Sequence, residues 1–301
     1  MKRDLILIII IGIVFSNICE AQSKTKKSRG DSLRKAGDIE GAIIEYQEIY
    51  KNNKMDLANI YSYAGVLSVE GHLDSAFKYL IISCQKDSTL TPLTDPSFIH
   101  LWEDKRWVEF ENDHILRVQK RFDKPINDIE YAKKLWRMNA RDQAYYDCLK
   151  IAQKKTGMNS SVVLAIWDLK NSLNKVNQTE LESLLELKGW PKFSQVGNRA
   201  ANTAFLIIQH SSNEKQKEYL PIIKQLCDQG EAYCQSYALM FDRVQTEDNK
   251  PQRYGSQVRY NDQTKKYELF PLEDIRQVDK WRAEVGLEPL AEYVSGWDIK
   301  L

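Results

Sequence analysis

The sequence predicts a mostly α-helical protein with one small β-hairpin, and three observations lead to this fold class. Two stretches near the N-terminus carry the same pattern about 34 residues apart, which is typical of stacked helical hairpins. From about residue 126 onward, apolar residues recur at the spacing of an α-helix. A single stretch, residues 253–270, alternates around a polar turn in the manner of a strand pair.

Length and charge leave room for two modest domains and argue against one class of partner. The chain has 301 residues and a formal net charge of +1. A net charge near zero provides no general attraction to nucleic acid or to an acidic membrane surface. We therefore expect no nucleic-acid partner.

Residues 1–21 have the pattern of a secretory signal peptide. Basic residues come first, an uninterrupted apolar run follows from Leu5 to Phe15, and small residues end the segment at Ala21. The run is about half of the roughly 20 residues that cross a bilayer. We expect cleavage after Ala21, no transmembrane anchor afterwards, and a periplasmic or extracellular protein. Lipidation of Cys19 is the alternative, although the bulky Ile18 precedes it.

Residues 22–30 are polar and basic, and we expect a short solvated leader there. The stretch LRKAGDIEGAIIEYQ follows, and LSVEGHLDSAFKYLI repeats it, with Gly71 in the place of Gly37 and Ala76 in the place of Ala42. The glycine is suited to end the first helix of a pair, and the small alanine lets the second helix pack closely.

This pattern resembles the tetratricopeptide repeat over about residues 23–90. The resemblance implies helical hairpins over residues 31–112 that present a groove to a protein partner. A repeat array needs a cap where stacking stops. We expect the cap to come from apolar residues in the following segment, namely Phe98, Leu101, Trp102 and Trp107.

A C-terminal domain is expected over residues 126–301. Apolar residues at helical spacing predict helices from Tyr131 to Tyr145 and from Val162 to Leu173. Further helices are predicted from Pro221 to Cys227 and from Glu231 to Val244.

Capping and turn signals predict the remaining helix boundaries. Thr179 with Glu182 has the form of a capping box, which would open a helix that Gly189 closes. Ser194 is placed to cap a helix that runs to about His210. The strand pair over residues 253–270 is followed by a last predicted helix, from Pro271 to Gly286.

Four cysteines remain once the signal is removed, in a compartment that permits disulfides. They are Cys84, Cys148, Cys227 and Cys234, and they allow three pairings. Cys227 and Cys234 can meet only if the segment that contains Gly230 turns the chain, because an unbroken helix would hold them about 10 Å apart. Buried free thiols are the other interpretation.

Six short motifs give residues 126–295 a second resemblance. They are GWP at 189–191, VG at 196–197, QH at 209–210, DR at 242–243, QRYGSQ at 252–257 and VDKWRAEVGL at 278–287. In order and spacing they are similar to a bacterial domain of unknown function, DUF6624, although Ser256 stands where threonine is expected. The resemblance implies a fold and a shared polar set, and no established activity.

Polar residues on two predicted helices suggest a candidate site. Arg199, Thr203 and His210 fall on one face of the helix from Ser194. If the later helix with Asp242 packs against it in the antiparallel sense, Asp242 can orient His210. An oriented histidine is a general base near neutral pH, so His210 and Asp242 are our candidate catalytic residues.

Other polar side chains are predicted to bind a ligand at the same place. They are Arg199, Gln209, Arg243, Tyr254 and Gln257, where the arginines would hold an anionic group and the last two residues would cover the cleft. A structural interpretation also fits. His210 can be a satisfied core histidine, Asp242 and Arg243 can form local ion pairs, and Gly255 can mark a bulge.

Common catalytic signatures are missing from the sequence. The motifs GxSxG, GxxxxGK[ST] and HExxH do not occur. With four histidines in the chain, three of them before residue 115, a zinc site would need ligands from distant helices. We therefore predict no metal and no cofactor.

These observations lead to two hypotheses about function. The first is an exported protein-binding or scaffold protein whose C-terminal domain holds a small ligand. The alternative is an exported, hydrolase-like enzyme that uses His210 and Asp242 in a polar cleft. A pocket with converging polar side chains would favour the enzyme, whereas a filled core would favour the scaffold.

Overall fold

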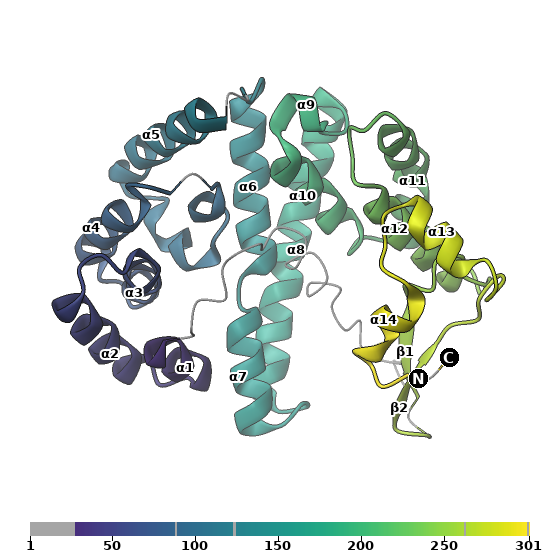
Figure 1. The fold of residues 1–301 in the computed structure, drawn as a ribbon, viewed down its shortest axis with the longest axis horizontal. Helices are drawn as coiled ribbons and strands as arrows, with labels where there is room; N and C mark the ends of the chain where they lie inside the picture. Colours follow the sequence, from purple (N-terminus) through teal and green to yellow (C-terminus); the bar gives the residue numbers. More distant parts are fainter. Residues whose placement is uncertain (1–27, 88, 123–124, 262, 300) are drawn as a thin grey trace.

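The computed structural model describes residues 28–87, 89–122, 125–261, 263–299 and 301. These residues are mostly α-helical with one small antiparallel strand pair, which confirms the predicted fold class. In Figure 1 the helices form an arch, with α1 to α5 in one limb, α6, α8 and α10 at the centre, and α11 to α14 in the other limb. The predicted signal peptide and residues 22–27 of the predicted leader lie outside the described residues.

The first limb contains α-helices and two short 3₁₀-helices. In chain order these are α1 Arg29–Ala36, α2 Ile39–Asn52, α3 Leu57–Val69, α4 Leu73–Cys84, η1 Thr91–Leu93, η2 Pro96–Leu101 and α5 Lys105–Phe122. The centre and second limb contain α6 Ile129–Gln143, α7 Tyr146–Thr156, α8 Ser161–Lys188, α9 Phe193–Val196, α10 Asn198–Ile208, α11 Asn213–Asp228, α12 Cys234–Glu247, β1 Val258–Asn261, β2 Lys266–Leu269, α13 Val278–Glu284 and α14 Leu290–Ser295.

The first limb begins with two similar helical pairs, α1 with α2 and α3 with α4. Gly37 and Gly71 follow the first helix of each pair with φ of 77° and 79°, a left-handed conformation that glycine adopts readily. Ala42 and Ala76 in the second helices are fully buried. The two pairs therefore have matching turns and matching close contacts.

The segment after α4 packs against the second pair. Phe98, Leu101 and Trp107 are buried, as expected of a cap. The Tyr61 hydroxyl on α3 donates to Asp95 at 2.8 Å, and its ring meets Phe98 edge-on. Part of the α3 surface is thus covered by the chain's own residues.

Helix α8 corrects the expectation for Thr179. It runs without interruption from Ser161 to Lys188, so Thr179 lies inside the helix and Glu182 closes no capping box there. The helix begins at Ser160, whose hydroxyl accepts from Val163 N, and it ends at Gly189, as predicted. A capping-box pattern inside a helix has no effect when the apolar residues before it already continue the helix.

Two other helix boundaries also differ from expectation. Gly197, with φ of 79°, divides the helix predicted from Ser194 into α9 and α10. Tyr145 is not part of the helix that begins near Tyr131, because α6 ends at Gln143 and Tyr145 is itself left-handed with φ of 67°. The chain therefore turns sharply between α6 and α7.

The second limb brings three further differences. Helix α11 begins at Asn213 and contains Pro221, which was expected to start it. Helix α12 begins at Cys234, because residues before it form a turn at Gly230. The predicted helix over 271–286 is reduced to α13, and the strand pair β1–β2 lies within the predicted residues.

One hydrophobic core extends through both limbs. It includes residues from Ala42 in the first pair to Met240 in α12. A disulfide joins Cys227 to Cys234 across the turn at Gly230, while Cys84 is a buried free thiol and Cys148 an exposed one. Within the described part of the chain, no helix has the length and hydrophobicity needed to cross a membrane.

Candidate functional site

His210 follows the end of α10, and it lies beside Asp142 at the end of α6 and Asn177 of α8. A shallow depression with no room for a water molecule is lined by Asp142, Asn174, Asn177, Ile207 and His210. The His210 side chain keeps 22% of its surface exposed, whereas that of Asp142 keeps 4%. The imidazole therefore lies between solvent and a buried carboxylate.

The backbone around His210 is held by side chains from three other helices. Arg243 of α12 donates to the Gln209 carbonyl at 2.6 Å, and Gln178 of α8 donates to the His210 carbonyl at 3.0 Å. Gln216 of α11 donates to the carbonyls of Gln209 and Ser211. Three consecutive carbonyls at the end of α10 thus have fixed partners, which hold the backbone that carries His210.

Asp142 is the carboxylate that faces His210. Its Oδ1 lies 4.0 Å from His210 Nε2, while its Oδ2 accepts from Gln143 Nε2 at 2.7 Å. The separation of 4.0 Å is longer than a hydrogen bond, and such contacts often tighten only when a substrate binds. In this structure the two side chains are neighbours that are not hydrogen-bonded to each other.

A buried ammonium group supports Asp142 from the other side. Lys170 of α8 is 2% exposed, and its Nζ donates to the carbonyls of Asp142 at 2.8 Å and Ala144 at 3.1 Å. The same Nζ lies 3.5 Å from the centre of the Tyr146 ring. Lys170 therefore caps the C-terminal end of α6, where a positive charge is favourable.

These groups have shifted protonation equilibria. Burial raises the pKa of Asp142 to about 6, although the Lys170 charge opposes the shift. Burial, together with the charges of Arg243 and Lys170, lowers the pKa of His210 to about 4. Burial lowers the pKa of Lys170 to about 8. At neutral pH the site contains an ionised Asp142, a neutral His210 and a protonated Lys170.

Asp242, the predicted partner of His210, makes its hydrogen bonds elsewhere. It is fully buried, and its carboxylate accepts from the backbone N–H groups of Arg253, Tyr254 and Ser256 at 2.8 to 3.2 Å. Burial raises the pKa of Asp242, and these three backbone bonds oppose the shift. Asp242 anchors a loop, and the residue that faces His210 is Asp142.

Tyr254 and Gln257, predicted to cover the cleft, belong to the anchored loop. Tyr254 is buried against the rings of Tyr237 and Phe241, and its carbonyl accepts from Arg282 Nη1 at 2.5 Å. Gln257 Nε2 donates to the Leu239 carbonyl at 3.3 Å. The loop is held against α12 and α13.

The remaining predicted ligand-binding residues are divided between two places. Arg243 and Gln209 are joined by the hydrogen bond beside His210, with Gln209 contributing its carbonyl. Arg199, at the start of α10, donates instead to the Thr91 hydroxyl at 3.1 Å in the first limb. The fold thus brings Gln209 and Arg243 to His210, and it directs Arg199 toward η1.

Sequence reasoning missed Asp142, Lys170 and Asn177. Lys170, Asn174 and Asn177 occur at spacings of four and three, so they share one face of α8. Lys170 and Asn177 are both buried. This row of polar residues on an otherwise partly apolar helix was the signal in the sequence that could have indicated the site.

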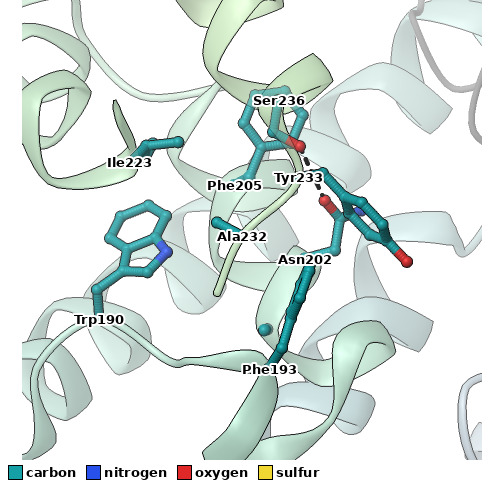
Figure 2. A pocket seen from close by; sticks show the side chains of 9 residues that line it. Trp190, Phe193, Asn202, Phe205, Ile223, Ala232, Tyr233 and Ser236 are labelled. Carbon is teal, nitrogen blue, oxygen red and sulfur yellow. Dashed lines mark hydrogen bonds between the residues drawn. The ribbon is translucent and has the colours of Figure 1, made fainter. Parts of the chain in front are cut away.

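A pocket lies on the other side of α10 toward α11 and α12. Its enclosed volume is about 10 Å³, and Figure 2 shows Trp190, Phe193 and Tyr233 around it. Its polar lining residues are Ser236 and Asn202, and the Ser236 hydroxyl donates to Asn202 Oδ1 at 3.1 Å. Its lining holds no carboxylate, histidine or lysine, so acid–base chemistry is better served at His210.

In the described ranges, no group of three or more His, Cys, Asp or Glu side chains is arranged to hold a metal ion. The donor set at His210 is therefore one imidazole and one carboxylate. The site has the composition of an acid–base pair.

Fold and site together define an α-helical protein with a histidine–carboxylate pair at the junction of three helices. Residues 133–298, more than half of the chain, match the family of unknown function DUF6624, and the chain belongs to that family. Neither the curated proteins nor the solved structures contain a significant match.

Proposed function

We propose that this protein is an exported enzyme of the hydrolase type, with His210 as general base and Asp142 as the carboxylate that orients it. The observation that carries the proposal is the fixed histidine. Side chains from α8, α11 and α12 hold the backbone around His210, while the imidazole lies beside a buried carboxylate in a shallow depression.

The protonation states assign a task to each side chain. In the proposed active arrangement, His210 Nε2–H turns toward the ionised Asp142 and Nδ1 is the proton acceptor. His210 would take a proton from water as the oxygen attacks the substrate, and would then return it to the leaving group. The Asp142 carboxylate stabilises the imidazolium formed between these steps.

Two features support a location outside the cytoplasm. The first 21 residues have the pattern of a signal peptide. The disulfide between Cys227 and Cys234 is of a kind that persists in oxidising compartments. Periplasmic or extracellular localisation is therefore part of the proposal.

The test is a screen for hydrolysis of chromogenic amides, esters, glycosides and phosphoesters by the purified protein. We expect one class to be cleaved, and His210→Gln and Asp142→Asn each to lower the rate by about 100-fold or more. His72→Gln is the matched control, because His72 is exposed at the start of α4. Circular dichroism would show that all variants are folded.

Equal rates in wild type and His210→Gln would contradict the assignment of the base. Loss of activity in His210→Gln with full activity in Asp142→Asn would retain the base and remove the role of Asp142. A screen without any cleavage by folded protein would contradict the hydrolase class.

We also propose a second function, the binding of a protein partner by tetratricopeptide-like repeats over residues 31–112. The support is the match between the two helical pairs, with left-handed Gly37 and Gly71 and buried Ala42 and Ala76. In this limb Ile44 is 62% exposed and offers an apolar contact.

Capture of a protein partner by wild type but not by Ile44→Glu would support this second function. Leu187→Glu, at an exposed position near the end of α8, is the control. Equal capture by both variants would contradict it.

A further inference from the structure

One side of α8 carries an apolar stripe that the fold leaves exposed. Val162, Leu169 and Val176 are 50%, 42% and 52% exposed, and they form this stripe. Residues seven positions apart are displaced by only about 20° around a helix, so the three side chains lie on one line about 21 Å long. Apolar residues at this spacing are typical of the contact line between paired helices. The stripe therefore has the form of an interface for another helix.

The protein's own packing uses a different side of α8. Val163 is buried in a cluster with residues of α7, and Lys170 and Asn177 donate to backbone carbonyls in and just after α6. Each of these residues follows a residue of the stripe by one position. Because one position turns the helix by about 100°, the stripe is directed away from α6 and α7. Substitutions in the stripe therefore leave these buried contacts in place.

Small side chains and then two opposite charges lie beside the stripe on the exposed surface of α8. Ala165 and Ser172 are exposed and small, which permits close approach of a second helix. Asp168 and Lys175 are also exposed, and they lie on the far side of these small residues. No ion pair joins either charge to another residue of the described ranges. The first half of α8 thus has an apolar edge and a charged edge.

A second copy of the same helix complements both edges when it runs in the antiparallel direction. In a two-fold symmetric pair, each contact between two different positions occurs twice, around one centre. Val162 then meets Val176 of the second copy around a centre at Leu169. Asp168 meets Lys175 of the second copy around a centre within about 4 Å of the first. A parallel pair would instead bring like charges together at both positions, which is unfavourable.

We propose that the protein forms a two-fold symmetric homodimer through the first half of α8, with the two helices antiparallel and Leu169 of each copy at the symmetry axis. The stripe supplies the apolar contact, and the opposite charges fix the direction of the helices. Because α8 begins at Ser161, the helices overlap from there to about Asn177. Leu187 lies beyond the overlap. The interface goes beyond the proposed enzyme, because its residues are not those of the His210 site.

The experiment is sedimentation equilibrium of the purified protein at about 1 to 500 µM. We expect the mass to rise from that of one chain to that of two, with a dissociation constant on the order of 10 µM, since the interface is small. Leu169→Glu should abolish the rise, because it brings two carboxylates together at the symmetry axis. Leu187→Glu, on the same helix outside the overlap, is the matched control and should leave the dissociation constant unchanged. Circular dichroism checks that both variants are folded.

Charge reversal tests the direction of the helices. Asp168→Lys and Lys175→Glu should each weaken the dimer by about tenfold, because each creates two like-charge contacts. The double variant restores both opposite pairs and should recover the affinity of wild type. An equimolar mixture of the two single variants should also dimerise, because each chain supplies the charges that the other lacks. Failure of both the double variant and the mixture to recover would overturn the antiparallel arrangement.

A cross-link gives a measurement that depends on position. In a Cys148→Ala background, Leu169→Cys should form a disulfide-linked dimer under mild oxidation, and Leu187→Cys should not. A monomer at every concentration would overturn the proposal and would leave the stripe to a different partner. A dimer that persists in Leu169→Glu, or one that cross-links equally through positions 169 and 187, would overturn it as well.

Discussion

The ammonium group of Lys170 donates to the backbone carbonyl of Asp142 at 2.8 Å, while the side chain of Asp142 faces His210. The buried Arg243 donates to the Gln209 carbonyl, next to His210. Each of the two helices that end at this site, α6 and α10, is thus capped by a buried cation. Cations at helix C-termini are favourable, and here they add to the effect of burial, which is the main cause of the lowered pKa of His210.

The first prediction concerns the pH dependence of stability. The folded pKa of Asp142, about 6, lies above its ordinary value of 3.8, so the stability due to Asp142 is present at low pH and is lost as pH rises through 6. The folded pKa of His210, about 4, lies below its ordinary 6.5, so its stability is present above pH 6.5 and is lost as pH falls toward 4. In the wild type the two effects oppose each other between pH 4 and 6.

Single variants should separate the two effects. In Asp142→Asn the free energy of unfolding should rise with pH between about 4 and 6.5, and in His210→Gln it should fall, with slopes of up to about 1.4 kcal/mol per pH unit. Urea unfolding at closely spaced pH values measures both. Lys170 and Arg243 are retained in each variant, so the difference between the slopes belongs to the pair. Parallel pH curves for the two variants would contradict the shifts.

The second prediction concerns the anchored loop. Asp242→Asn replaces one acceptor oxygen by an NH₂ group, which would face a backbone N–H such as that of Ser256. Because hydrogen bonds to a buried charge are strong, we expect a loss of about 2 to 3 kcal/mol in the free energy of unfolding. Amide hydrogen exchange should accelerate at residues 253–256 and in the strand pair β1–β2.

Asp228→Asn is the matched control for Asp242→Asn. Asp228 forms an exposed ion pair with Lys224 at 2.6 Å, one turn away on α11. An exposed pair of this type contributes little, so a change within about 0.5 kcal/mol is expected. Equal destabilisation by the two substitutions would show that the hydrogen bonds of Asp242 contribute no more to the free energy of unfolding than the exposed ion pair of Asp228.

Much of the fold could be predicted from local signals in the sequence. The turns at Gly37 and Gly71 and the alternating residues of β1 and β2 depend on neighbouring residues, and the structure confirms these predictions. Signals that depend on context failed. Thr179 has a capping pattern, but it lies within α8, where the helix is already established. Gly197 separates two helices that periodicity alone would join.

The site could be predicted only in part, because it depends on how helices cross. The sequence suggests a carboxylate beside His210, but it does not show whether Asp242 or Asp142 lies next to the imidazole in the fold. Asp142 lies at the end of α6, far from His210 in the chain, and the apolar periodicity within the later helices gives no information about it. Asp242 lies on α12, where the sequence predicted a partner for His210. Its carboxylate instead accepts from the backbone N–H of Tyr254 in the loop.

The last prediction concerns the disulfide between Cys227 and Cys234, which closes the turn between α11 and α12. Replacing both by alanine should lower the free energy of unfolding by about 2 to 3 kcal/mol, since the unfolded chain loses a short closed loop. Urea unfolding with and without reductant measures this. Reductant should lower the stability of wild type and leave the double variant unchanged.

Cys148→Ala is the control, because this exposed thiol forms no disulfide and its loss should leave the effect of reductant intact. Mass spectrometry of an unreduced digest should find the peptides of Cys227 and Cys234 joined. A link that includes Cys84 or Cys148 would contradict the pairing.

The turn also carries Ala232 and Tyr233, which line the pocket around Trp190. Reduction should therefore broaden the NMR signals of Trp190, whereas those of His210, held by Gln178, Gln216 and Arg243, should remain sharp.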